Sequence, residues 1–210
     1  MNSLQRILLI GSLIGATVFA EPPSHLFTAA AFTKAQRNSS IPTDAGIFVH
    51  LPDHGWVPYG PKIQAVNSAA VDPSDPSRIF LSCGNGIVRS VDSGKTWRMV
   101  TDWRISDANA VVIDPTDGNN VYAATGWGLV RSRDGGESWE NINRGLGEQF
   151  SKTIGLDANN PRRLLAGTGG GLFESTNSGN SWRRVKALPE THVLRLRRGV
   201  AQPQVWLAVT

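Results

Sequence analysis

Two acidic side chains, Asp107 and Glu148, are of the residue type that cleaves glycosidic bonds. That chemistry needs two carboxyl groups about 5–10 Å apart, one to protonate the leaving oxygen and one to act as base or nucleophile. Both residues lie in polar stretches between apolar runs, where acids that only face solvent are also expected. The sequence therefore leaves the catalytic residues unknown and offers Asp107 and Glu148 as the only plausible pair.

Two tryptophans and three arginines are candidates for ligand binding: Trp103, Arg104, Trp127, Arg195 and Arg197. An indole ring offers a flat apolar face to a sugar ring or a peptide, and a guanidinium binds a carboxylate through two parallel hydrogen bonds. Arg195 and Arg197 alternate with leucine, so they share one face of an expected strand and could line a central channel. Structural alternatives stay open, namely tryptophans packed beneath loops and arginines that keep an edge strand polar against aggregation.

A repeated stretch sets the spacing of these candidates along the chain. It runs from a serine to a tryptophan at 90–97, 132–139 and 175–182, and we call these stretches the Ser–Trp segments. Their closing tryptophans are 42 and 43 residues apart, and a degenerate copy at 46–56 ends 41 residues before the first of them. A period of this length is typical of a repeat architecture.

The residue types within each Ser–Trp segment predict a tight turn between two strands. A glycine supplies the positive φ, an aspartate or asparagine accepts hydrogen bonds from turn amides and flanking hydroxyls, and the tryptophan packs between adjacent sheets. The residues with these structural roles are Ser90, Asp92, Gly94, Trp97, Ser132, Asp134, Gly136, Trp139, Ser175, Asn177, Gly179 and Trp182.

Each repeat offers four strand-length apolar runs with turn signals between them, as at 110–113, 121–125, 128–132 and 138–142. No window carries the 3.6-residue period of a helix. Units of this kind are typical of propeller blades. The sequence therefore predicts an all-β fold, a β-propeller of four-stranded antiparallel blades, incomplete, with about four to five blades present.

The pattern S-x-D-x-G-x-[ST]-W resembles the Asp-box, or bacterial neuraminidase repeat, of sialidase-like β-propellers, and the resemblance covers roughly residues 46–210. It implies that the boxes are structural turns away from the active site and that they bind no metal. A sialidase would also need an arginine triad, a tyrosine–glutamate pair and an acid/base aspartate, a set that cannot be placed here. Similar repeats occur in xyloglucan-hydrolysing glycosidases, sortilin-type receptors and photosystem II assembly factors, so the repeat does not imply chemistry.

Strand order predicts which residues share an end of the propeller. In a four-stranded meander, the first and third turns lie on one rim, here called the Ser–Trp rim. The second turns and the links between blades lie on the other, here called the connection rim. The connection rim is expected to hold the links 57–62, 101–109, 143–152 and 186–192, and with them the two candidate acids and both candidate tryptophans.

The first twenty residues predict export. A positive start at Arg6 precedes an apolar run from 7 to 20 that ends in Val18-Phe19-Ala20, which is typical of a cleaved signal peptide; an uncleaved anchor is the alternative. Residues 21–45 are then a linker or partial strand, and 46–210 the propeller. Its expected blades are 62–100, 105–142 and 150–186, with partial blades before and after, which favours a fragment of a longer propeller or assembly between chains. The predicted location is secreted or periplasmic.

Charge and composition narrow the partners. The formal charge of +4 falls to +3 when Arg6 is removed with residues 1–20, which is too small to favour nucleic acid. The lone Cys83 cannot form an internal disulfide, and no cofactor or metal is expected. Two functions stay open, a protein- or glycan-binding scaffold with possible self-association, and a fragment of a secreted sialidase-like or xyloglucanase-like glycoside hydrolase.

Overall fold

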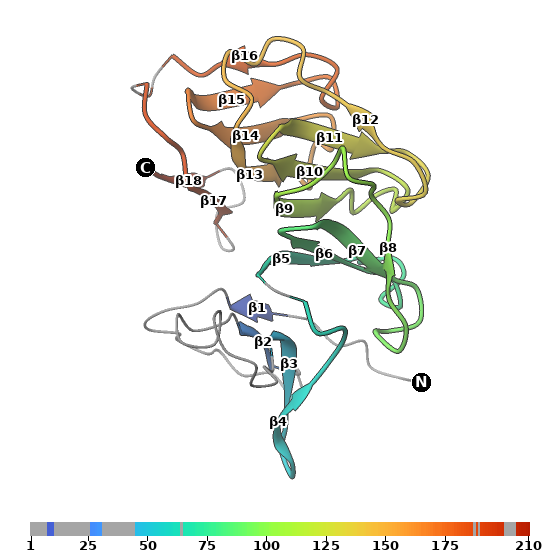
Figure 1. Cartoon of the computed structure of the whole chain (residues 1–210). Helices are drawn as coiled ribbons and strands as arrows, with labels where there is room; N and C mark the ends of the chain where they lie inside the picture. Colours follow the sequence, from blue (N-terminus) through green and yellow to red (C-terminus); the bar gives the residue numbers. More distant parts are fainter. Residues whose placement is uncertain are drawn as a thin grey trace.

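The computed structural model describes residues 8–10, 26–30, 45–63, 65–186, 188, 190–199 and 205–210. Within these residues the regular structure is all strand and no helix is present. Four sheets have four strands each and a fifth has two. Figure 1 shows the sheets fanned in chain order, with β5, β9 and β13 neighbouring one another on the inner side and β8, β12 and β16 outside.

The strands follow the repeat in order. The first sheet contains β1 (Leu8–Ile10), β2 (Leu26–Ala30), β3 (Gly46–Leu51) and β4 (Gly55–Pro58). The second contains β5 (Val66–Val71), β6 (Ile79–Cys83), β7 (Gly86–Ser90) and β8 (Arg98–Met99). The third contains β9 (Ala108–Ile113), β10 (Val121–Thr125), β11 (Gly128–Ser132) and β12 (Glu140–Asn141). The fourth contains β13 (Ser151–Leu156), β14 (Leu164–Thr168), β15 (Gly171–Ser175) and β16 (Arg183–Arg184), and the fifth β17 (Arg195–Arg198) and β18 (Trp206–Val209).

In every sheet, strands that are neighbours in the chain are neighbours in the sheet, and the second, third and fourth sheets are simple antiparallel meanders. All pairs are antiparallel except β1 with β2, which is parallel. The described sheets form part of a β-propeller. The predicted fold class is confirmed.

The first sheet differs from the predicted boundaries. Its innermost strand, β1, comes from within the predicted signal peptide, and β2 lies in the predicted linker. The rest of residues 1–25 and all of 31–44 lie outside the described residues. The predictions of a signal peptide and a linker therefore stay predictions.

The core lies between sheets rather than within one. Tyr122 and Leu129 of the third sheet pack against Leu164, Phe173 and Trp182 of the fourth. The second strand of each regular sheet, β6, β10 and β14, is buried along its whole length. This burial on both faces explains why these strands read as continuous apolar runs and not as alternating ones.

The Ser–Trp segments form the same turn three times. In the second copy, the Ser132 hydroxyl donates to Asp134 Oδ1 (2.7 Å) and accepts from the Gly136 amide (2.7 Å), while Ser138 donates its amide and its hydroxyl to the Asp134 carboxylate. The first copy repeats these bonds at Ser90, Asp92, Gly94 and Thr96. In the third, Asn177 Oδ1 accepts from Ser175 and its Nδ2 donates to Ser181 Oγ (2.9 Å).

The strand after each turn is shorter than the sequence indicates. The predicted strands at 96–100, 138–142 and 181–185 reduce to two residues each, at β8, β12 and β16. The tryptophan that precedes each of these strands stands outside the ladder, and in the third copy its amide donates to Arg144 O instead (2.9 Å). Trp182 is 3% exposed and its indole donates to Ile142 O of the preceding sheet (2.7 Å), whereas Trp97 and Trp139 are only partly buried.

Candidate functional site

Backbone hydrogen bonds tie the links between sheets to the second turns and place both on one rim. The Asp107 amide donates to Gly84 O (2.8 Å), and the Gly126 amide donates to Asp107 O (3.0 Å). One sheet further on, the Gly169 amide donates to Phe150 O (2.9 Å). The connection rim is therefore a set of loops held in place by the ends of rigid sheets.

Trp103 and Arg104 stand on the first of these loops. Trp103 is 80% exposed, and the Arg104 guanidinium lies 4.8 Å from the centroid of its ring. The Arg104 amide and the Arg104 guanidinium both donate to the Asp102 carboxylate (2.9 and 2.7 Å). The contact with Arg104 lowers the pKa of Asp102, chiefly because the Arg104 amide donates to the carboxylate. The loop thus presents an ordered, exposed indole with a cation over it.

Trp127 lies at the tip of the two-residue turn between β10 and β11. It is 64% exposed, and its indole nitrogen donates to Ser106 Oγ (3.2 Å) on the loop that carries Trp103. Gly128, at φ +122, makes this turn possible, because a Cβ there would overlap Asn143. The alternative in which both tryptophans pack beneath loops is wrong, because two-residue turns and short links leave nothing to cover them.

The two candidate acids lie against the second turns of different sheets. Asp107 lies against Gly126, and Glu148 lies against Gly169 and Gly170 one sheet further on. No hydrogen bond or ion pair joins them in the part of the chain that the structure describes. Their catalytic role stays a prediction.

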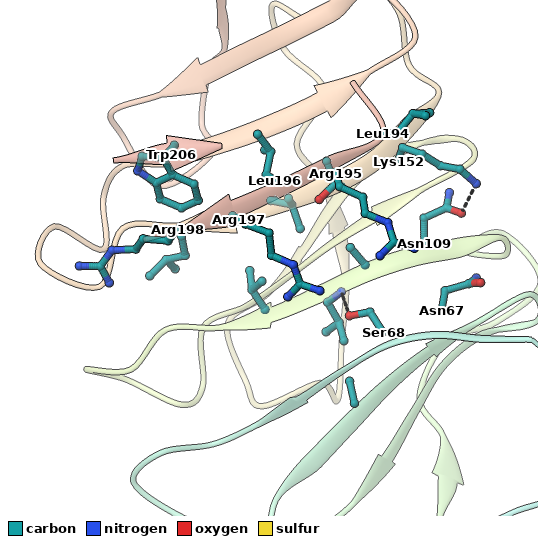
Figure 2. A pocket seen from close by; sticks show the side chains of 18 residues that line it. Asn67, Ser68, Asn109, Lys152, Leu194, Arg195, Leu196, Arg197, Arg198 and Trp206 are labelled. Atoms are coloured by element: carbon teal, nitrogen blue, oxygen red, sulfur yellow. Dashed lines mark hydrogen bonds between the residues drawn. The ribbon is translucent and has the colours of Figure 1, made fainter. Parts of the chain in front are cut away.

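A cavity of about 510 Å³ lies along the inner strands, and we call it the channel. It is lined by parts of β5, β9, β13, β17 and β18, and Figure 2 shows the Arg195 and Arg197 side chains extending from β17 toward β9 and β5. Its lining residues are Asn67, Ser68, Ala69, Asn109, Ala110, Val111, Val112, Lys152, Thr153, Ile154, Gly155, Leu156, Leu194, Arg195, Leu196, Arg197, Arg198 and Trp206.

Polar side chains link neighbouring sheets around this channel. Asn67 Nδ2 donates to Ala108 O (2.8 Å), and Asn109 Nδ2 donates to Ser151 O (3.0 Å), one repeat further on. Lys152 holds the equivalent position in the next sheet and donates back to Asn109 Oδ1 (3.0 Å). These three residues were missed from the sequence. Comparing position 67 with 109 and 152 would have revealed them, because an inner strand needs no polar residue there for packing.

The Ser–Trp rim has a second cavity, of about 420 Å³, between the third and fourth sheets. Arg131 crosses it and is 4% exposed. Its guanidinium donates to Ser178 O and Asn180 Oδ1 in the next turn and to Glu140 Oε1 (2.7 Å). The bond from Arg131 to the backbone of the next turn has equivalents in the earlier sheets. Arg89 donates to Gly135 O, and the Tyr59 hydroxyl donates to Ser93 O (2.6 Å). These contacts join sheets, which is a structural role.

Ionisation on the Ser–Trp rim follows from the same bonds. The hydroxyl of Thr96 lowers the pKa of Asp92 to about 2, and that of Ser138 lowers the pKa of Asp134 to about 2. Burial raises the pKa of the Tyr122 hydroxyl and of the Cys83 thiol.

No group of three or more potential metal ligands occurs among the described residues. Within the same residues, no helix has the length and apolar character to cross a bilayer.

The sequence matches no family model, and no curated protein is significantly similar to it. Solved structures are similar in fold. A GH74 xyloglucanase from Xanthomonas campestris has a TM-score of 0.62 at 18% identity over 80% of this chain and 32% of its own. YCF48 bound to a D1 peptide has a TM-score of 0.55 at 21% identity, over 73% of this chain and 50% of its own. An extracellular domain from B. thetaiotaomicron has a TM-score of 0.63 at 20% identity, over 79% of this chain and 23% of its own.

These neighbours agree with the propeller fold. The chain spans half or less of the length of each of the three. At such identities the likeness concerns the fold alone. Because the neighbours include enzymes and a peptide-bound protein, the fold does not choose between catalysis and binding.

Proposed function

We propose that this chain is an exported β-propeller of the Asp-box class that serves as a protein- or glycan-binding scaffold. The three matching turns of the Ser–Trp segments support the class. The similar fold of an extracellular domain and of a peptide-bound propeller supports binding and export. The observation that carries the proposal is the exposure of Trp103 and Trp127 on one rim.

Large exposed aromatic rings on ordered loops are suited to binding. Trp103 is positioned by Asp102 and Arg104, and Trp127 by Ser106, so neither loop must be ordered when a ligand arrives. Preorganisation of this kind raises affinity because less conformational entropy is lost on binding. Tryptophan and arginine are also the residue types that contribute most at binding surfaces.

The test compares matched tryptophan variants on glycan and peptide arrays. Trp103→Ala with Trp127→Ala should weaken binding to the recognised class at least about tenfold, the cost expected for removing hot-spot rings. Trp56→Ala is the control, since Trp56 is 47% exposed but lies on β4 in the first sheet. Equal binding by the double variant and the wild type would exclude the connection rim as the binding surface.

Export is part of the proposal and has its own test. A signal peptide at 1–20 places the protein in a secreted or periplasmic location, and cleavage after Ala20 would remove β1 from the first sheet. N-terminal sequencing of the protein recovered from outside the cytoplasm should begin at Glu21. A mature protein that still begins at Met1 would contradict cleavage.

The domain organisation is also proposed, as a linker at 21–45 and a propeller at 46–210 with partial blades at either end. Self-association of such a chain would cover sheet faces that have no neighbour. Native mass spectrometry measures this directly. A monomer that unfolds cooperatively would count against assembly between chains.

A second candidate, a fragment of a secreted glycoside hydrolase, is favoured by one observation, the similarity in fold to GH74 enzymes. Its proposed catalytic pair is Asp107 and Glu148. Hydrolysis of xyloglucan or of a sialoside, abolished by Asp107→Asn or Glu148→Gln, would establish it in place of the binding scaffold.

A further inference from the structure

The channel contains positive charge that no acid within it balances. Lys152, Arg195 and Arg197 are among its 18 lining residues, and none of the 18 is an aspartate or a glutamate. No ion pair involves any of these three cations in the described part of the chain. Other arginines form ion pairs with acidic residues, for example Arg131 with Glu140 and Arg163 with Glu174.

The repeat itself does not call for arginines at these two positions. When β18 is aligned with β14, Arg195 corresponds to Ser68, Ala110 and Thr153, and Arg197 to Ala70, Val112 and Gly155. In the other sheets these positions hold small or apolar residues, because the next sheet packs over them. Only in β17 do they hold long cationic side chains, so packing does not explain them.

Donors remain available in the channel after its internal hydrogen bonds are made. An ammonium has three N–H donors, and Lys152 gives one to Asn109 Oδ1. Each guanidinium has five N–H donors in a planar fork that matches a carboxylate. Three cations without acids raise the local potential, and a concave wall concentrates it. The channel is therefore chemically complementary to an anion with several oxygen atoms.

The spacing of the arginines indicates how carboxylates would be arranged. Residues two apart on a strand lie about 7 Å from each other on the same face. Acidic residues at alternate positions of an extended peptide have the same separation, so two carboxylates could each meet one guanidinium. A free linear dicarboxylate of similar length shares this chemistry.

We propose that the channel binds an extended acidic peptide segment with carboxylates at alternate residues, held by Arg195 and Arg197 and supported by Lys152. This site is distinct from the tryptophans of the connection rim and goes beyond the scaffold function proposed above. It assigns an anionic ligand to a surface whose charged residues are all cations.

Fluorescence anisotropy with the full-length protein tests the proposal. The probe is a labelled, end-capped peptide Glu-Thr-Glu-Thr-Glu; the comparison peptides are Gln-Thr-Gln-Thr-Gln and Thr-Glu-Glu-Glu-Thr, and adipate is the free dicarboxylate. We expect the alternating peptide to bind most tightly, and its binding to weaken as salt is raised. Arg195→Gln and Arg197→Gln should each weaken it about tenfold, since each removes a charge-assisted hydrogen-bond pair.

Matched variants separate the site from net charge and from folding. Arg183→Gln on β16 removes the same charge from an exposed outer strand and should leave binding unchanged. Arg195→Lys with Arg197→Lys keeps the charge but loses the forks, and should give an intermediate affinity. Trp56 on β4 lies outside the channel, and Trp56→Ala should also leave peptide binding unchanged. The peptide probe measures binding in the channel and the arrays measure binding at the rim, so the two proposals are tested separately.

Three outcomes would overturn the proposal. Equal binding by Arg195→Gln with Arg197→Gln and by the wild type, with unfolding midpoints alike, would show that the arginines only keep β17 polar. Binding of adipate without binding of the alternating peptide would assign the channel to small dicarboxylates. Equal loss of affinity in Arg183→Gln would reduce the effect to overall charge.

Discussion

On the Ser–Trp rim, three turns repeat the same hydrogen bonds, while on the connection rim the links between sheets differ in length and composition. The links at 100–107, 142–150 and 185–194 have no common pattern and carry the most exposed tryptophan, Trp103. Polar groups of the Ser–Trp rim form hydrogen bonds within each turn and between neighbouring turns. On the connection rim, and in the channel beside it, polar and aromatic groups remain available.

The difference shows how a repeat separates stability from binding. A turn that must fit against its neighbour in every sheet is constrained by the fold, so its chemistry is repeated. A link whose only structural duty is to reach the next sheet is free to vary. The four predictions below test whether substitutions on the two rims have these different consequences.

The largest effect is expected from Trp182→Ala. The ring is 3% exposed, packs between the third and fourth sheets, and donates to Ile142 O (2.7 Å). Its loss should lower the free energy of unfolding by about 3–5 kcal/mol, as large-to-small core substitutions do. Urea denaturation followed by circular dichroism measures this. A loss below about 1 kcal/mol would mean that the ring does not hold the sheets together.

The next effect is expected from Arg131→Met, which keeps much of the side-chain volume. The substitution removes the donors to Ser178 O, which is half-buried, and to the exposed Asn180, where water can replace the donor, so we expect a loss of about 1 kcal/mol in the same assay. Arg133→Met is the matched control. Arg133 shares Glu140 but is 61% exposed, so its removal should cost less than about 0.5 kcal/mol. Equal costs would contradict a clamp between sheets.

A smaller effect concerns pH. Asp92 and Asp134 have a folded-state pKa of about 2, below the ordinary 3.8, because turn hydroxyls and amides donate to them. Their contribution to stability is fully present above about pH 4 and is lost as the pH falls toward 2. Asn177 has no such titration. Asp134→Asn should therefore flatten the fall in unfolding midpoint below pH 4, and Asn177→Asp should steepen it.

The opposite results in that pH series would be informative. If Asp134→Asn left the acid-side slope unchanged, the carboxylate would not be the group whose protonation weakens the turn. Thermal scans of the wild type in matched buffers give its unfolding midpoint at each pH, and the slope of that series is the reference for both variants.

The smallest effect is expected on the connection rim. Trp103→Ala and Trp127→Ala should each change the free energy of unfolding by no more than about 0.5 kcal/mol, because both rings are exposed. The two substitutions together should weaken rim binding at least about tenfold if the proposed function holds. A large loss of stability would instead give these tryptophans the structural role of Trp182 and remove the contrast between the rims.

Much of the fold followed from the sequence, while the site followed only in part. The serine, acid and glycine of each Ser–Trp segment predicted the turn, and the four apolar runs of each repeat predicted the order of the strands. The shortened strands β8, β12 and β16 could not be foreseen, because the residue pattern of 96–100, 138–142 and 181–185 does not show where the backbone pairing begins and ends. The exposure of Trp127 was left open as well, since a side chain at a turn tip is covered or bare depending on the adjacent link.

The sequence by itself determined the unit, because a turn and its flanking strands depend on hydrogen bonds between residues a few positions apart. Only the tertiary structure decided what the units enclose. Asn67, Asn109, Lys152 and the pair Arg195 and Arg197 come from successive repeats, about forty residues apart at each step, and meet in one channel. Their meeting depends on how each sheet stacks on the next, and stacking is set by the side chains between sheets rather than by any local pattern.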